Sequence, residues 1–140
     1  AEKLGLARDL LEDQARRVVV PGTGGSVLSI DAEVRLAQLT LDAGRQIRSL
    51  APFGMEFGEP LFLARGVALE AISPLKGETH ARVRLEQGGV RMSGVLFYAP
   101  PEFIQLRPGV RLDVVFHFQL DEWRGQIRPQ LSLRDWRPAA

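Results

Sequence analysis

The spacing of hydrophobic residues changes along the chain. In the first part, apolar residues recur at helical spacing over about residues 2–19 and 41–51, with a mixed β-type stretch at 27–34 between them. In the second part, apolar and polar residues alternate, which is typical of strands with one buried face. The sequence therefore predicts an N-terminal helix-strand-helix appendage, residues 1–60, followed by a β domain, residues 61–140.

Local signals set the limits of the predicted helices. Residues 21–25 read Pro-Gly-Thr-Gly-Gly and end the first helix in a turn or short linker. Thr40 is a good N-cap for the second helix, whose predicted apolar side holds Leu41, Ile47 and Leu50. The loop at 53–60 is rich in Gly and Phe and shows neither period, so we place the domain boundary there.

Turn signals divide the second part into five strands and one short helix. Gly66 interrupts the first strand as a bulge, and Gly88-Gly89 indicates a hairpin. Pro100 and Pro101 favour a short helix at 100–106, because proline is tolerated where a helix starts. The predicted strands are 61–73, 81–86, 90–98, 111–121 and 126–136.

The order of these elements predicts a fold. Three strands, a short helix and two further strands are the order of the five-stranded OB barrel. A long, bulged first strand also fits, since it must pair at both ends to close the barrel. We therefore predict a mainly β chain with an OB barrel; another small barrel or the edge of a sandwich are the alternatives.

Composition and charge narrow the possible functions. The 140 residues include no Cys, which excludes a disulfide scaffold, thiolate metal sites and a Cys nucleophile. The net charge of +1 divides unevenly: residues 1–60 carry 7 basic and 9 acidic side chains, and residues 61–140 carry 11 and 8. Only Lys3 and Lys76 are lysines, and arginine suits contacts with phosphates and bases.

Catalytic and metal-binding motifs are missing from the sequence. The two histidines, His80 and His117, are far apart, and no multi-histidine, phosphate-loop or serine-nucleophile motif occurs. No apolar run approaches the roughly 20 residues that span a bilayer. We therefore expect no catalytic residues, no metal or other cofactor in this chain, and no membrane partner.

Binding is the better prospect, because OB barrels hold single strands with basic grooves and aromatic platforms. The candidate nucleic-acid-binding residues are Lys76, Arg82, Arg84, Arg91, Tyr98, Trp123, Arg124 and Arg128. Two alternatives stay open: Arg82 and Arg84 form only a solvated face, and Trp123 caps the barrel end instead of stacking on a base. Of the neighbours Phe97 and Tyr98, we expect one to face inward and one outward.

Two short motifs carry a resemblance to a known family. Residues 51–55 read Ala-Pro-Phe-Gly-Met, and residues 59–62 read Glu-Pro-Leu-Phe. The tail reads Glu-Trp-Arg-Gly at 122–125 and continues as Gln-Leu-Ser-Leu-Arg-Asp at 130–135. With these motifs, residues 27–138 resemble the C-terminal region of RecJ, a family of bacterial single-strand-specific 5′→3′ DNA exonucleases.

The resemblance implies more than the residues alone. It implies that the parent protein is a manganese- or magnesium-dependent, cytoplasmic nuclease of DNA repair and recombination. The family's Asp-His-His motif is missing here and the chain lacks an initiator Met, so we expect the C-terminal part of such a nuclease or a separate protein made from it. The expected partners are single-stranded DNA, the nuclease core and other repair proteins. The alternative is a structural OB domain that braces the core or recruits a partner without gripping DNA.

Overall fold

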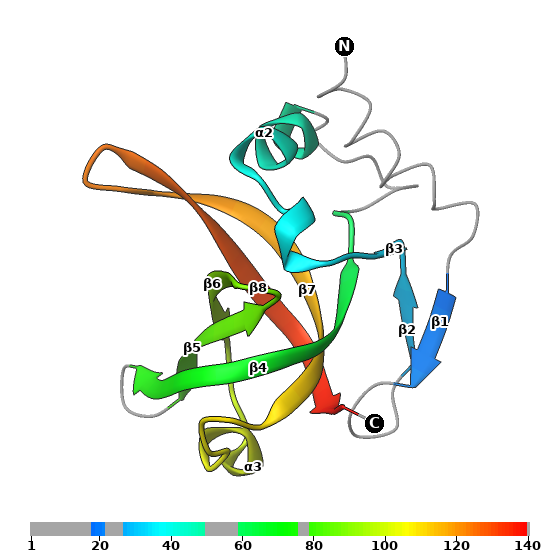
Figure 1. Ribbon diagram of the computed structural model, residues 1–140, viewed down its shortest axis with the longest axis vertical. Helices are drawn as coiled ribbons and strands as arrows, with labels where there is room; N and C mark the ends of the chain where they lie inside the picture. Colours follow the sequence, from blue (N-terminus) through cyan, green and yellow to red (C-terminus); the bar gives the residue numbers. More distant parts are fainter. Residues whose placement is uncertain (1–17, 22–26, 50–58, 76–78, 140) are drawn as a thin grey trace.

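A computed structural model describes residues 18–21, 27–49, 59–75 and 79–139 (Figure 1). The elements in chain order are β1 (Val18–Pro21), β2 (Val27–Ile30), β3 (Ala32–Glu33), the 3-10 turn η3 (Leu36–Gln38), α2 (Leu41–Ser49), β4 (Phe62–Leu75), β5 (His80–Gln87), β6 (Val90–Leu96), α3 (Pro101–Ile104), β7 (Arg111–Trp123) and β8 (Gln126–Pro138). The five strands and short helix predicted after residue 60 are all present, with ends shifted by a few residues.

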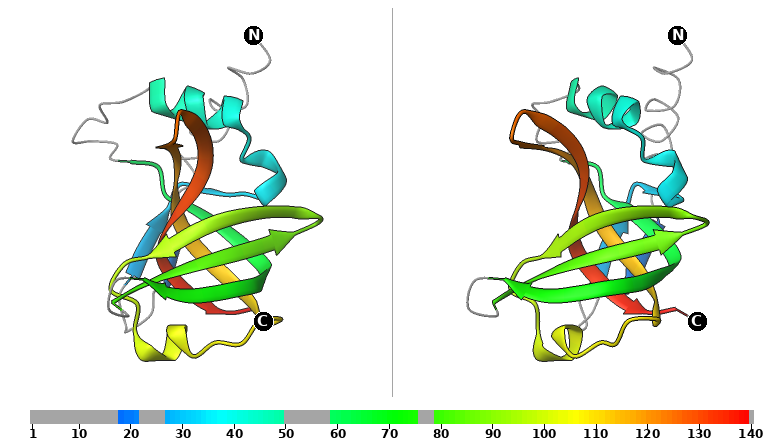
Figure 2. Two further views of the ribbon diagram at one scale, coloured as in Figure 1. Left: turned by 90° about the vertical axis from the view of Figure 1, so that its left-hand side faces the viewer. Right: turned by 60° about the vertical axis from the view of Figure 1, so that its left-hand side comes forward.

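Strands β4 to β8 form a closed barrel. Their order is β4-β5-β6-β8-β7, and a further pairing of β4 with β7 closes the ring (Figure 2). β6 and β8 run parallel, whereas the other barrel pairs are antiparallel. This is the predicted OB arrangement, in which the first strand pairs with two neighbours and the last strand lies between the third and the fourth.

Strand β4 pairs on both sides because it bends at two irregularities. Its register shifts between Ala64 and Val67 against β7, and between Leu69 and Ala71 against β5. Gly66 lies at the first shift with a φ of 66°, a left-handed conformation that glycine adopts without steric cost. The predicted bulge at Gly66 is confirmed.

A buried carboxylate holds this bulge to the opposite strand. Asp113 of β7 is 5% exposed, and its Oδ1 accepts a hydrogen bond from the Gly66 backbone N–H at 2.9 Å. Its Oδ2 accepts one from Arg137 Nε at 3.1 Å and lies 3.8 Å from Arg65 Nη1. Hydrogen bonds and two positive charges offset the cost of burying the carboxylate.

The β5–β6 hairpin turns at Gly88 and Gly89, as predicted, with φ values of 58° and 87°. Two successive positive φ values fit the tight turn that joins twisted antiparallel strands. Just before the turn, the Gln87 side chain accepts a hydrogen bond from the Leu36 N–H at 2.8 Å and donates one to the Arg65 carbonyl at 2.7 Å. This amide links the hairpin, η3 and the bulge of β4.

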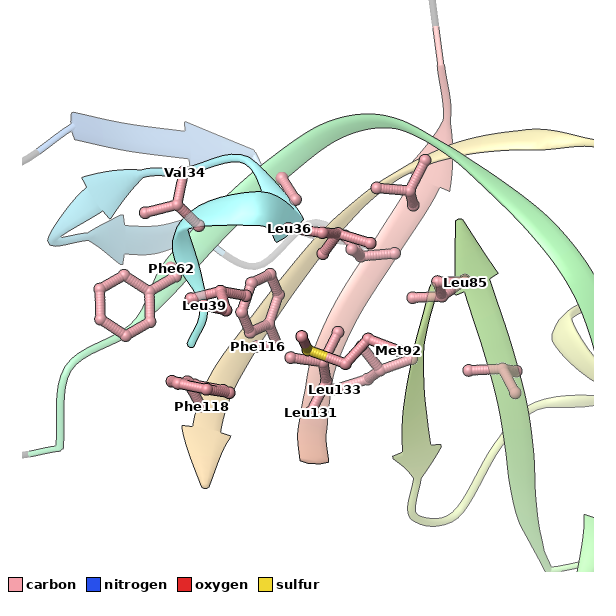
Figure 3. Packing of buried hydrophobic residues seen from close by; sticks show 14 of the residues in the cluster. Val34, Leu36, Leu39, Phe62, Leu85, Met92, Phe116, Phe118, Leu131 and Leu133 are labelled. Atoms are coloured by element: carbon pink, nitrogen blue, oxygen red, sulfur yellow. The ribbon is translucent and has the colours of Figure 1, made fainter. Parts of the chain in front are cut away.

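Alternating side chains of the strands fill the barrel (Figure 3). Phe62 and Phe116 are fully buried, with ring centroids 6.1 Å apart. At one end, Phe103 of α3 is also fully buried and packs against Trp136 of β8 at 5.1 Å. The short helix therefore plugs the barrel with one aromatic side chain.

Residues before the barrel contribute to the same core. Val34, Leu36 and Leu39 are at most 3% exposed and belong to the hydrophobic cluster of the barrel (Figure 3). β3 pairs in parallel with the start of β4, where Ala32 lies opposite Phe62. The division into domains at residue 60 stays a prediction, but these residues of the appendage pack as part of the barrel.

Helix α2 lies at the end of the barrel opposite α3, beside the β7–β8 hairpin (Figures 1 and 2). Thr40 is its N-cap as predicted, since its Oγ1 accepts a hydrogen bond from the Ala43 N–H at 3.1 Å. Ile47 is buried, but Leu41 is 37% exposed, so its placement on the buried side was wrong. Gly44 packs so closely on β7 that a Cβ there would lie 2.6 Å from Leu120 Cδ2. Leu50 lies outside the described residues.

The N-terminal predictions need two corrections. The end of the helix predicted over 2–19 is wrong, because Val18–Pro21 forms β1 and pairs with β2. The three valines there are β-branched and favour an extended backbone. The strand predicted over 27–34 is interrupted at Asp31, whose backbone N–H and side-chain Oδ2 both bind the backbone of Leu61 at 2.8 Å. Residues 1–17, which hold most of the predicted first helix, and residues 50–58, which hold most of the loop predicted at 53–60, lie outside the described residues.

Candidate nucleic-acid interface

The outer face of β5 and β6 carries the central pair of predicted binding residues. Strand alternation buries Val83 and Leu85 and leaves Arg82 and Arg84 exposed. The register places Arg82 opposite Val95 and Arg84 opposite Ser93 on β6. Val95 in turn lies opposite Ser132 of the parallel strand β8, so the face continues onto that strand.

A pocket of about 260 Å³ opens where this face meets the β7–β8 hairpin. Its lining residues are Arg82, Ser93, Val95, Asp121, Arg128, Pro129 and Gln130. The fold thus brings Arg82 of β5 and Arg128 of β8 to one concave site, although 46 positions separate them in the sequence. Two guanidinium groups at a polar concave site suit an anionic group such as a phosphate.

The other predicted basic residues differ in their surroundings. Arg91 is exposed on β6, but its Nε donates a hydrogen bond to Glu70 Oε1 at 2.8 Å, which neutralises part of its charge. Arg124 is exposed in the β7–β8 turn, with a φ of 49°. Lys76 and the side chain of Trp123 lie outside the described residues, so both alternatives for Trp123 stay open.

Three aromatic rings gather at the end of the same face, and only one of them was predicted there. β6 ends at Leu96, and Phe97 and Tyr98 follow it with exposed fractions of 54% and 80%. The expectation that one of them faces inward is therefore wrong. The ring of His80 lies 5.0 Å from Phe97 and 5.1 Å from Tyr98, in edge-to-face geometry.

The reason for this error is a change of backbone direction at Tyr98. Its φ of 54° ends the alternation of the strand, and its N–H donates a hydrogen bond to His80 Nδ1 at 3.0 Å. His80 was not among the predicted binding residues. The sequence contained one signal for the position of His80. Side chains alternate along a strand, so His80, Arg82 and Arg84 lie on the same face.

Arg65 and His117, which lie away from this face, contact groups within the protein. Arg65 donates a hydrogen bond from Nε to Glu33 Oε1 at 2.8 Å. This hydrogen bond raises the pKa of Arg65 above its ordinary value, with smaller contributions from the charges of Glu33 and Asp113. His117 Nδ1 lies 2.9 Å from the carbonyl oxygen of Pro60 and 3.4 Å from Glu59 Oε2, where it holds the start of β4 to β7.

Neither a metal centre nor a membrane span is found in the described part of the chain. Among these residues, no three His, Asp or Glu side chains are grouped so that they could hold a metal ion. None of the described helices is long and apolar enough to cross a membrane.

The barrel order, the capping helix and the face beside the last hairpin define the chain as an OB-fold domain. The family model of the RecJ OB domain matches residues 30–135, so the chain belongs to the RecJ OB domain family. This confirms the resemblance that the motifs of the sequence indicated.

Individual relatives agree with this assignment. The chain is 24% identical over 110 residues to the single-stranded-DNA-specific exonuclease RecJ of Bacillus subtilis. The matched region covers 78% of this chain and 14% of that protein. Two crystal structures of RecJ from Thermus thermophilus share its fold. The Mg²⁺ complex has a TM-score of 0.63 at 21% identity and covers 81% of this chain and 17% of that one. The Mn²⁺ complex has a TM-score of 0.57 at 23% identity and covers 71% of this chain and 14% of that one. The chain thus spans about a sixth of these relatives or less.

Proposed function

We propose that this chain is the single-stranded-DNA-binding OB module of a RecJ-like 5′→3′ exonuclease that acts in DNA repair and recombination. It grips the substrate strand beside a catalytic core that is not part of this sequence. The observation that carries the proposal is the outer face of β5, β6 and β8, where Arg82 and Arg128 line one pocket and Arg84 is exposed beside Arg82 on β5.

The physical basis is charge and shape together. Single strands bind to OB barrels along a positively charged groove, and much of the affinity comes from counterions released by phosphate contacts. Arg82 and Arg128 line the same pocket, so one phosphate of a bound strand can meet both guanidinium groups. Arg84 lies one strand repeat further along β5, where it can meet the next part of the backbone.

Charge reversal tests this proposal. The double variant Arg82→Glu/Arg84→Glu should lower the affinity for a single-stranded oligonucleotide by at least about tenfold, because two phosphate contacts become repulsive. Fluorescence anisotropy at one fixed salt concentration measures the effect. The matched control is Arg48→Glu/Arg107→Glu, which changes the net charge equally at exposed positions on α2 and after α3.

The control should keep its affinity within about twofold. If the two double variants lose affinity equally, the effect is one of net charge and the β5–β6 face does not grip DNA. If neither changes, the chain is the structural or partner-recruiting domain of the alternative. Two observations favour that alternative: Glu70 pairs with Arg91, and Asp121 lines the pocket.

The remaining parts of the proposal concern the longer protein. A manganese or magnesium ion would belong to the nuclease core, because the described residues of this chain offer no group of ligands for it. The proposed location is the cytoplasm, and the proposed partners are single-stranded DNA, the nuclease core and other repair proteins. A metal-dependent cleavage assay on the parent protein, with and without this domain, would test this part.

A further inference from the structure

We propose that His80, Phe97 and Tyr98 form a stacking site for an unpaired nucleobase at the α3 end of the β5–β6 face. We further propose that His80 is the positioning residue that holds this site in shape. The inference rests on the proposed function and deepens it, because it separates a place for bases from the place for phosphates.

The first observation is the exposure of the two aromatic rings. Phe97 is 54% and Tyr98 is 80% exposed, although strand alternation should have turned one of these neighbours toward the core. Both rings contact the imidazole of His80 edge to face, at 5.0 and 5.1 Å between centroids. Aromatic rings exposed at the surface are the platforms on which single-stranded nucleic acids stack.

The second observation is the strained backbone that presents them. Tyr98 has a φ of 54°, a conformation that is rare for residues with a side chain and persists where the surroundings enforce it. Two hydrogen bonds do so here: the Tyr98 N–H donates to His80 Nδ1 at 3.0 Å, and the Ala99 N–H donates to the Thr79 carbonyl at 2.9 Å. The first of them depends on an acceptor in the His80 side chain.

The third observation identifies the occupant. His80, Arg82 and Arg84 alternate along the outer face of β5, so the aromatic site continues directly into the row of arginines. A ligand that crosses both regions must offer flat apolar rings at one end and negative charge along its length. An unpaired nucleic acid strand meets both needs, whereas an apolar peptide segment would leave the arginines without partners.

Stacking is tested by removing the aromatic rings from the protein and, separately, the bases from the DNA strand. The wild-type chain should bind oligothymidylate of about twelve nucleotides at least about fivefold more tightly than an abasic strand of equal length. The double variant Phe97→Ala/Tyr98→Ala should lose this preference while its affinity for the abasic strand stays within about twofold of wild type. Leu41→Ala, which removes an exposed apolar side chain on α2, is the control and should keep the preference.

The outcomes separate this inference from the proposed function. The proposed stacking site is wrong if the wild type binds oligothymidylate and the abasic strand equally well, or if the double variant keeps the preference for bases. Phosphate binding by the arginines would still stand. If neither strand binds, the proposed function itself fails and the inference with it. Thermal unfolding of each variant shows whether a lost preference comes from lost structure.

Two substitutions of His80 test its positioning role. His80→Asn keeps a hydrogen-bond acceptor near the position of Nδ1, and His80→Phe keeps an aromatic ring without an acceptor. If the hydrogen bond to Tyr98 positions the site, the asparagine variant should retain the preference for bases within about twofold, and the phenylalanine variant should lose most of it. Retention by the phenylalanine variant, or loss in the asparagine variant alone, would overturn the role of His80.

Discussion

Single polar side chains at buried positions decide how the barrel closes. Asp113 joins the bulge at Gly66 to Arg137, and Asp31 joins two backbone segments through Leu61. Each side chain replaces a hydrogen bond that regular strand pairing would have supplied. Contacts of this kind join residues 24 or more positions apart, so a local hydrophobic pattern does not reveal them.

The substitution Asp113→Ala tests the importance of this closure. It leaves the Gly66 N–H and the Arg137 guanidinium without their acceptor, which should lower the free energy of unfolding by about 1–3 kcal/mol. Urea denaturation measures the change, with Asp121→Ala at an exposed position as the control. A loss of stability no greater than that of the control would mean that the bulge holds without the carboxylate.

At the scale of elements, the sequence predicted what local spacing controls. β5 alternates as expected, Gly88-Gly89 turns the hairpin, and Thr40 caps α2. The errors fall where a distant contact overrides the local pattern. The backbone of β6 turns at Tyr98 through its hydrogen bond to His80, and the strand after Val27 stops at Asp31 because that residue binds Leu61.

The cap of α2 gives a prediction at this scale. Thr40→Ala removes the acceptor for the Ala43 N–H and should destabilise the chain by about 1 kcal/mol. Thr40→Ser, which keeps the hydroxyl group, should restore most of the stability. Thermal or urea unfolding compares the two variants; equal losses would show that the hydroxyl hydrogen bond does not support the helix.

For the whole molecule, strand order carried the correct fold prediction. Three strands, a helix and two strands predict an OB barrel, and the closed ring of β4 to β8 confirms it. The packing of Val34, Leu36 and Leu39 inside the barrel could not be predicted, because periodicity does not say which surface an apolar residue meets. The candidate site was predicted in part: Arg82, Arg84 and Arg128 share one face, whereas His80 and Phe97 were missed as members of it.

The salt dependence of single-strand affinity tests the central claim most directly. Each phosphate neutralised on a single strand contributes about −0.7 to the slope of log K against log salt concentration. If Arg82 and Arg128 share one phosphate and Arg84 contacts the next, two phosphates are neutralised and the slope for this chain should be about −1.4. A slope near zero, or no measurable binding at low salt, would contradict the account of this chain as a module that grips single-stranded DNA.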